Sequence, residues 1–303
     1  MPLADRVDPD LRFDYTTVGH VTIDVLDNGS RQAGGAAFYS ALQAARLGRR
    51  ALIITQGVAR EIEQVIEPHR SELDVRILPA RHTTTLQTSG SGAQRSQRML
   101  AWAGPIEQDL AVDTEILHLA PVARESPTRW RGPAQFVGLT PQGLVRQWSG
   151  ARKQIRSTPP TRPAMLVAGH CNALVLSEHE RANCARLIDR ASAAGAVIAI
   201  TAGERPTTII APHSRRHAKL QVPAIESPAS DLGAGDVFAA AFFLALADRA
   251  DPLDAARFAN AAAAVRMSGT DADAIGDLDE LEARLRLTGG GARQLRLTFS
   301  HPV

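Results

Sequence analysis

Short segments of two kinds alternate along the N-terminal part of the chain, and this alternation constrains the fold more than any other feature. Tyr15–Val25, Ala51–Thr55 and Val75–Leu78 are apolar or rich in β-branched residues, which predicts strands. Between them, Ala36–Leu47 and Arg60–His69 are predicted helices. Strands that alternate with helices favour a mostly parallel sheet covered by helices.

The remainder of the chain continues this order. Further strands are predicted at Ile116–Val122, Gln135–Leu139, Ala164–Val167, Ala173–Leu176 and Val197–Thr201, with a helix at Glu178–Gly195 and an antiparallel pair at Thr208–Ala211 and Ala218–Val222. Arg81–Trp102 breaks the rhythm, because a threonine-rich strand, a glycine-serine turn and a second strand predict a hairpin there. No structure is predicted for Ser149–Pro163, a basic segment that contains prolines.

Length and charge exclude several classes of protein. A chain of 303 residues with 44% hydrophobic content suits one large α/β domain with a small appendage, or two modest domains. The formal net charge is only +2 and no run of like charges occurs, so nucleic-acid binding has little support. No apolar run approaches the length of a membrane helix, and the first residues lack a signal-peptide pattern. We therefore expect a cytoplasmic protein that binds no membrane.

Cysteines and histidines give no metal pattern. Cys171 and Cys184 are not in a metal-ligand spacing, and free thiols are favoured over a disulfide. His20, His118 and His170 lie in or beside apolar strand segments, which favours packed or edge histidines over ligands.

The stretch Asp231–Phe238 carries the clearest chemical signal. Its Gly-Ala-Gly turn ends in Asp236, and an apolar helical run follows at once. Backbone N–H groups at the start of a helix suit an anion, and a carboxylate beside them could take a proton from a nucleophile. An anion cradle next to a base is what phosphoryl transfer to a hydroxyl needs. The alternative interpretation is an aspartate that caps the helix.

This stretch, together with the alanine-rich segment Asp251–Val265, resembles the C-terminal signature of the ribokinase/PfkB family of carbohydrate kinases. The resemblance implies a three-layer α/β/α fold with a mostly parallel central sheet. It also implies one kinase domain over residues 1–303, with a small β lid from about residues 25–33 and 81–102 above the substrate.

The resemblance assigns roles at the donor end of the site. Asp236 would be the general base, and Gly233, Ala234 and Gly235 would offer N–H groups to the phosphate. The resemblance implies ATP and Mg²⁺ as cofactors. Some members of the family also use a monovalent cation at this loop, but Asp231 lies one position away from the usual family aspartate.

Four further residues resemble nucleotide or metal positions of the family. Thr201 and Gly203 match its nucleotide loop, and Asn260 matches an asparagine near the adenine. Glu180 would help to hold Mg²⁺ through water, although Ser177 stands where the family has asparagine. Ser177 and Glu180 equally fit a helix capping box, and both roles are compatible.

At the acceptor end, Asp24 would bind sugar hydroxyls, or it is an ordinary aspartate before a turn. Gly34 and Gly35 resemble the glycine pair that lets the sugar approach the backbone. The family's asparagines after that pair are absent, and Ala36 and Tyr39 stand there instead. This start looks more like the inositol-kinase-like branch, and Tyr39 faces either the substrate or the core.

Two other segments resemble the family. Arg95–Leu100 is similar to a lid strand, so Arg95 or Arg98 would touch the substrate or lie solvated on the lid edge. Pro141–Arg146 supports membership without assigning a role.

The resemblance implies an ATP-dependent kinase that phosphorylates a hydroxyl of a sugar or cyclitol, with a homodimer through the lid as a candidate assembly. The alternatives are a nucleoside kinase of the same fold and a binding protein that senses a sugar or nucleotide without turnover. A dinucleotide dehydrogenase ranks below these, since no Gly-x-Gly-x-x-Gly follows the first strand.

Overall fold

The protein is described by a computed structural model that covers residues 12–90, 94–107, 109–150, 153–212, 217–225 and 227–287. Residues 91–93, in the turn of the predicted hairpin, and the N-terminal segment through residue 11 lie outside the described residues.

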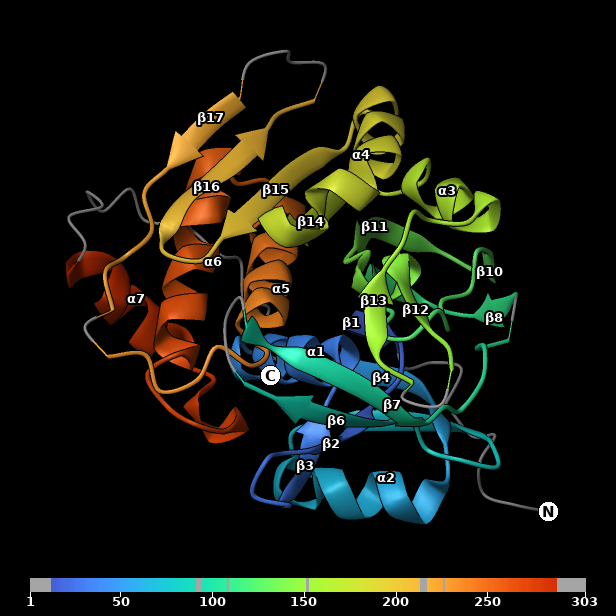
Figure 1. Cartoon of the computed structure of the whole chain (residues 1–303). Helices are drawn as coiled ribbons and strands as arrows, with labels where there is room; N and C mark the ends of the chain where they lie inside the picture. The colour runs from blue at the N-terminus through green and yellow to red at the C-terminus, as the bar shows by residue number, and fades with distance from the viewer. Residues whose placement is uncertain are drawn as a thin grey trace.

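A nine-stranded sheet forms the centre of the molecule (Figure 1). Its order is β17-β16-β15-β14-β11-β9-β1-β4-β5, and the strands from β15 to β5 are parallel to their neighbours. Only the pairs β15–β16 and β16–β17 are antiparallel within this sheet. Its strands are β1 (Phe13–Val18), β4 (Ala51–Gly57), β5 (Asp74–Pro79), β9 (Thr114–Leu119), β11 (Ala134–Leu139), β14 (Ala173–Ser177), β15 (Val197–Ala202), β16 (Arg205–Ile210) and β17 (His217–Leu220).

Helices cover both faces of this sheet. The helices are α1 (Ala36–Arg46), α2 (Ala59–Ile66), α3 (Arg162–Ala168), α4 (Glu178–Ala193), α5 (Ala234–Ala247), α6 (Pro252–Arg266) and α7 (Leu278–Leu287), with short 3₁₀ helices at Glu67–His69, Gln142–Val145 and Ala272–Ala274. One apolar core joins α1, α5 and α6 to the sheet, and the other joins α3 and α4 to its opposite face. Helix α5 is buried on nearly all sides because its residues after Asp236 are apolar throughout. The predicted three-layer α/β fold with a mostly parallel sheet is confirmed.

Two predicted elements differ in the structure. The predicted strand Tyr15–Val25 is split, because the chain leaves the large sheet after Val18 and enters a second sheet at β2 (Thr22–Val25). The predicted strand Ala164–Val167 is wrong, since these residues lie in α3. Thr161 is the N-cap of that helix and a proline occupies its first turn, a pattern typical of a helix start.

The second sheet has four strands in the order β3-β2-β6-β7, and it projects below the large sheet in Figure 1. It contains β2 and β3 (Arg31–Gly34) together with β6 (Thr85–Ser89) and β7 (Ser96–Ala101). Strands β6 and β7 are antiparallel neighbours, as the hairpin prediction requires. We call these four strands the small sheet; its action as a lid stays a prediction.

A separate pair of strands packs against the small sheet. Strand β12 (Arg146–Trp148) ends just before Ser149–Pro163, the stretch for which no structure was predicted, and β13 (Ile155–Ser157) lies inside it. The two strands are antiparallel. The pair contacts β7 through the bridge between Arg98 and Gln154 and through the Met99 N–H, which donates to the Lys153 carbonyl at 3.0 Å. An apolar cluster of Leu86, Met99, Val122, Ala123, Trp102, Trp148 and Ile155 lies at this junction. The small sheet and the β12–β13 pair therefore pack as one unit.

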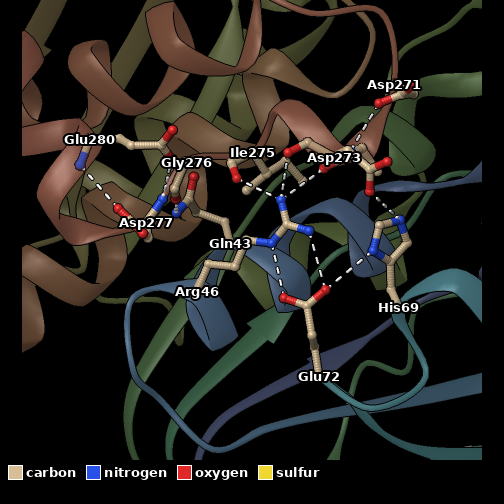
Figure 2. A network of polar contacts seen from close by, with 11 residues as sticks. Gln43, Arg46, His69, Glu72, Asp271, Asp273, Ile275, Gly276, Asp277 and Glu280 are labelled. Atoms are coloured by element: carbon tan, nitrogen blue, oxygen red, sulfur yellow. Dashed lines mark hydrogen bonds and ion pairs between the residues drawn. The ribbon is translucent and has the colours of Figure 1, made fainter.

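Figure 2 shows how the segment after α6 is attached to α1. The Arg46 guanidinium donates to the carbonyl oxygens of Ala272, Asp273 and Ile275 at 2.6–3.1 Å and pairs with Glu72 at 2.9 Å. Gln43 donates to the Gly276 carbonyl at 3.0 Å. One face of α1 thus positions the chain that leaves α6.

None of the described helices is long and apolar enough to cross a bilayer.

Candidate active site

Charged side chains gather where the parallel strands of the large sheet end. Asp24 follows β1, Glu125 follows β9, Arg146 follows β11, and Glu180 follows β14. Carboxyl ends of parallel strands lie along the same edge of a sheet, and that edge is where α/β folds bind ligands. The four groups come from distant parts of the chain and are brought to one place by the order of the strands.

The turn Gly233–Gly235 begins α5 beside this edge. Gly233 is the N-cap with φ of 78°, a left-handed conformation that glycine adopts without strain. The Ala234 N–H is used within the turn, donating to the Asp231 carbonyl at 3.2 Å. Gly235 is exposed, and among the described residues no neighbour lies within 4 Å of where a Cβ would be. The first turn of α5 therefore has room for an anion near its N–H groups.

Asp236 lies in that same first turn. Burial raises the pKa of Asp236 to about 7, Glu180 and Asp24 add to the rise, and Arg146 and Arg95 oppose it. The backbone of Asp236 is fixed by α1, since the Ser40 hydroxyl donates to the Asp236 carbonyl at 2.9 Å. A fixed carboxyl with a pKa near neutrality is suited to exchange protons.

Asp24 is a second buried carboxyl of the site. Only 3% of its surface is exposed, and burial raises its pKa to about 6, against the effect of the Thr22 hydroxyl and of Arg146 and Arg95. The Thr22 hydroxyl donates to Oδ1 at 2.8 Å. Gly34 on the neighbouring strand leaves space for the carboxylate, because a Cβ there would lie 2.4 Å from Oδ2.

Gly34→Ala should therefore weaken acceptor binding. The methyl group would displace the Asp24 carboxylate, and overpacking of this kind costs about 1–3 kcal/mol, which corresponds to roughly ten-fold or more in the KM of the acceptor. Steady-state kinetics at a saturating donor concentration measure this effect. The control is the same substitution in an Asp24→Ala background, where the space is already free and the additional cost should nearly vanish.

Arg146 lies between the charged groups of the edge. Its NH1 donates to the Val122 carbonyl at 3.0 Å and its NH2 to Gln97 Oε1 on β7 at 2.8 Å. Burial lowers the pKa of Arg146, whereas the surrounding carboxylates Glu180, Asp236, Asp24 and Glu125 raise it. One guanidinium thus connects the small sheet to the large one and offsets the charge of both buried aspartates.

A second arginine joins the small sheet to the turn before α5. Arg95, directly before β7, forms an ion pair with Asp231, and the two side chains are about a quarter to a third exposed. Arg95 Nε is buried and has no hydrogen-bond partner among the described residues. The aspartate that is displaced by one position relative to the family pattern is therefore the partner of the arginine predicted to bind substrate.

Glu180 has the capping role that its spacing predicted. Its Oε2 accepts from the Ser177 N–H at 2.8 Å and from the Ser177 hydroxyl at 2.9 Å. The field of Glu180 nevertheless reaches Asp236 and Arg146, as their pKa shifts show. No cluster of three or more metal-ligating side chains occurs in the part of the chain that the structure describes. That Glu180 helps to hold a metal through water stays a prediction.

A model of the pfkB family of carbohydrate kinases matches residues 141–275, which include Arg146, Glu180 and the Gly233–Asp236 turn. Over these residues the chain is similar to pfkB-family carbohydrate kinases. No curated protein matches it.

Solved structures confirm the fold over most of the chain. Arabidopsis thaliana ribokinase with ribose and ATP is similar with a TM-score of 0.69 and 15% identity, over 91% of this chain and 99% of that one. The nucleoside kinase of Methanocaldococcus jannaschii gives a TM-score of 0.68 and 18% identity over 91% and 99%. A pyrophosphate-dependent kinase of the ribokinase family is similar with a TM-score of 0.67 and 19% identity, over 89% of this chain and 99% of that one.

The residues predicted to bind nucleotide lie on β15, in the turn after it and on α6. Thr201 is near the end of β15, and Gly203 is exposed in the following turn with φ of 65°. Asn260 on α6 is buried and its oxygen accepts from the Thr207 hydroxyl at 3.1 Å. Its Nδ2 is buried and has no partner among the described residues, and its binding of a base stays a prediction.

Tyr39 packs against the turn Gly233–Gly235, which we call the anion turn. It is 2% exposed, and its ring lies so close to Gly233 that a Cβ there would be 2.5 Å from Cδ1. The hydroxyl makes no hydrogen bond within the described residues. Tyr39 thus packs in the apolar core beside the Gly233–Gly235 turn, as the second of the two interpretations made from the sequence has it.

Two members of the site, Arg146 and Glu125, carry no distinct sequence signal of their own. Arg146 ends the family-like segment Pro141–Arg146. Glu125 is fully buried and accepts N–H groups from His20 at 2.9 Å and from Val122 at 2.7 Å. The signal available for both was a charged residue soon after an apolar strand, which is weak without knowledge of the strand order.

His118 and the two cysteines are packed in the core, whereas His170 is exposed. His118 is fully buried, contacts Tyr15 and Thr140 at 2.9 and 3.0 Å, and has a pKa lowered to about 3 by burial. Cys171 and Cys184 are free and buried, and burial raises the pKa of each thiol to about 12, so neither is a reactive thiolate.

Proposed function

We propose that this kinase transfers the γ-phosphoryl group of ATP, with Mg²⁺, to a hydroxyl of a sugar or cyclitol. The observation that carries the proposal is Asp236, a carboxyl whose pKa is raised to about 7, in the first turn of a helix whose preceding turn is open to an anion. A base next to an anion site supplies the two groups that an attacking hydroxyl and a transferred phosphate require.

The residues divide into an acceptor half and a donor half. Asp24 binds hydroxyls of the acceptor, since a carboxylate accepts two or more hydrogen bonds. Asp236 takes the proton of the attacking hydroxyl. The N–H groups of Gly233 and Gly235 and the Arg146 guanidinium stabilise the negative charge that develops on the phosphate; the Ala234 N–H donates to the Asp231 carbonyl instead. Gly34 and Gly35 keep the backbone close to the acceptor.

Mg²⁺ fits the donor half as an ion held mainly by phosphates and water. It prefers to keep several waters and one or two carboxylates, and Glu180 has one oxygen outside its capping bonds. When bound, the ion would neutralise phosphate charge. Thr201, Gly203 and Asn260 would hold the nucleotide.

Closure of the small sheet would exclude water, which competes as an acceptor. Arg95 links that sheet to the turn before α5, and Arg146 links it to the large sheet. Movement of the small sheet would therefore change the contacts of both arginines. A homodimer through the small sheet would use β3, which is an edge strand, whereas the β7 edge contacts the β12–β13 pair.

The test is ADP release from ATP and Mg²⁺ with a panel of sugars, cyclitols and nucleosides. A parallel arm measures orthophosphate release from pyrophosphate, because a pyrophosphate-dependent kinase is among the similar structures. Asp236→Asn is the inactive control and Asp74→Asn, an exposed aspartate of β5, the matched control. Turnover with a polyol that Asp236→Asn loses supports the proposal. Turnover restricted to nucleosides favours a nucleoside kinase, and ligand-induced stabilisation without turnover favours a sensor.

A further inference from the structure

A buried arginine lies beneath the anion turn and is not explained by the roles above. Arg266, the last residue of α6, is fully buried. Its NH1 donates to the Gly269 carbonyl at 3.0 Å, but Nε and NH2 have no hydrogen-bond partner among the described residues. No ion pair with Arg266 occurs among those residues either. A buried charge without a partner is destabilising, and the negative end of α6 offsets it only in part.

The Tyr39 ring separates this guanidinium from the anion turn. Arg266 Cζ lies 5.7 Å from the centroid of the ring, and the same ring packs directly against Gly233. The Arg266 guanidinium, the Tyr39 ring and the α5 turn are therefore arranged in series. The adjacent loops are also joined, because the Ala229 N–H donates to the Met267 carbonyl at 2.8 Å.

The surroundings of Tyr39 place it between opposite charges. Burial raises the pKa of Tyr39 to about 12, Asp24 and Asp236 add to the rise, and Arg266 opposes it. Arg266 acts on the phenol both through its charge and as a side-chain hydrogen-bond donor. The contact is nevertheless too loose to have the distance and angle of an ordinary hydrogen bond.

We propose, resting on the proposed function, that Arg266 is a positioning residue whose buried charge offsets the charge of a phosphate at the Gly233–Gly235 turn and holds the Tyr39 ring against Gly233. Arg266 touches neither acceptor nor donor. Among the described residues no carboxylate forms an ion pair with this charge, and a bound phosphate supplies negative charge across the ring. A charge at this remove in a protein interior is worth roughly ten-fold or more in anion affinity.

The experiment measures pyrophosphate binding by titration calorimetry in wild type, Arg266→Met and Arg257→Met. Methionine replaces the charge with an apolar chain. Arg257 is the matched control, since it lies on the same helix, is 45% exposed and pairs with Asp254. We expect Arg266→Met to bind pyrophosphate at least about ten-fold more weakly and Arg257→Met to bind as wild type does. Arg266→Lys, which keeps the charge, should retain most of the affinity.

Thermal unfolding separates this role from a structural one. Without anion, Arg266→Met should be as stable as wild type or more stable, because a buried charge has been removed. With pyrophosphate, its melting temperature should rise less than that of wild type. A folded Arg266→Met that binds pyrophosphate like wild type overturns the proposal, as does a variant that is destabilised without anion yet gains as much as wild type from it.

The outcome is separable from that of the proposed function. If wild type binds pyrophosphate but phosphorylates no acceptor, the kinase proposal fails while the comparison of affinities still decides the role of Arg266. If wild type phosphorylates an acceptor and Arg266→Met has the same donor KM, only the inference fails. Absence of pyrophosphate binding to wild type overturns the inference.

Discussion

Asp236→Asn is expected to lower kcat by about 10²–10⁴-fold, because a positioned general base contributes that much to a proton-transfer step. In wild type, kcat/KM should rise with pH through about 7, where Asp236 loses its proton. The residual activity of the variant should lack this rise. Initial rates between pH 5 and 9, with Asp74→Asn as the control, test both statements, and a variant that keeps the wild-type pH profile would exclude Asp236 as the base.

The same substitution should change how stability depends on pH. The pKa of Asp236 is raised in the folded state. Its contribution to the free energy of unfolding is therefore fully present below the unfolded pKa near 4 and is lost as pH rises through the folded pKa of about 7. The difference between 3.8 and about 7 corresponds to at most about 4 kcal/mol. Asp236→Asn should therefore gain stability relative to wild type between pH 4 and 8. Urea unfolding at both ends of this range measures the gain, and a constant difference would contradict the raised pKa.

Arg146→Met is expected to lower kcat/KM at pH 7 by about 10²–10³-fold, the usual cost of removing one group that stabilises developing negative charge. It should also move the pH profile. Arg146 lowers the pKa of Asp236 and of Asp24, so its loss raises both and shifts the midpoint of the profile to higher pH. Steady-state kinetics across pH measure the two effects together.

Two further variants control this second prediction. Arg146→Lys keeps a positive charge, so most of the shift in the midpoint of the pH profile should disappear. Lysine cannot replace both hydrogen bonds that the guanidinium donates to the Val122 carbonyl and to Gln97. Arg156→Met removes an exposed arginine of β13, the strand paired with β12, and should leave the profile unchanged. A folded Arg146→Met with an unshifted midpoint would show that Arg146 does not act on the two aspartates.

Local patterns were sufficient to predict most of the large sheet and the start of α5. Alternation of strands and helices is a property of neighbouring residues, and so is the Gly-Ala-Gly-Asp turn. The split between β1 and β2 was not predictable in this way, because residues on both sides of Gly19 suit a buried strand and only the tertiary structure assigns them to different sheets. The apolar run in α3 was likewise ambiguous between strand and helix.

Site residues were predictable where they lie in a recognisable turn and not where strand order assembles them. Asp236 directly follows the Gly-Ala-Gly turn, and Asp24 stands at the end of a predicted strand. Arg146 acquires its role only because β11 lies between β9 and β14, which brings the end of each strand to the same edge. The pairing of Arg95 with Asp231 also joins segments far apart in sequence, so no local pattern indicates it.

The position of β1 has a consequence for how the chain folds. This first strand lies inside the large sheet, and its partners are β4, formed next along the chain, and β9, with Tyr15 opposite Ile116. Closing that long loop is entropically costly, and parallel pairing between distant segments is slow. During synthesis the β1–β4 pair can form first, but the other edge of β1 stays unpaired until β9 has left the ribosome. We expect refolding to be limited by this pairing and aggregation to begin from that exposed edge.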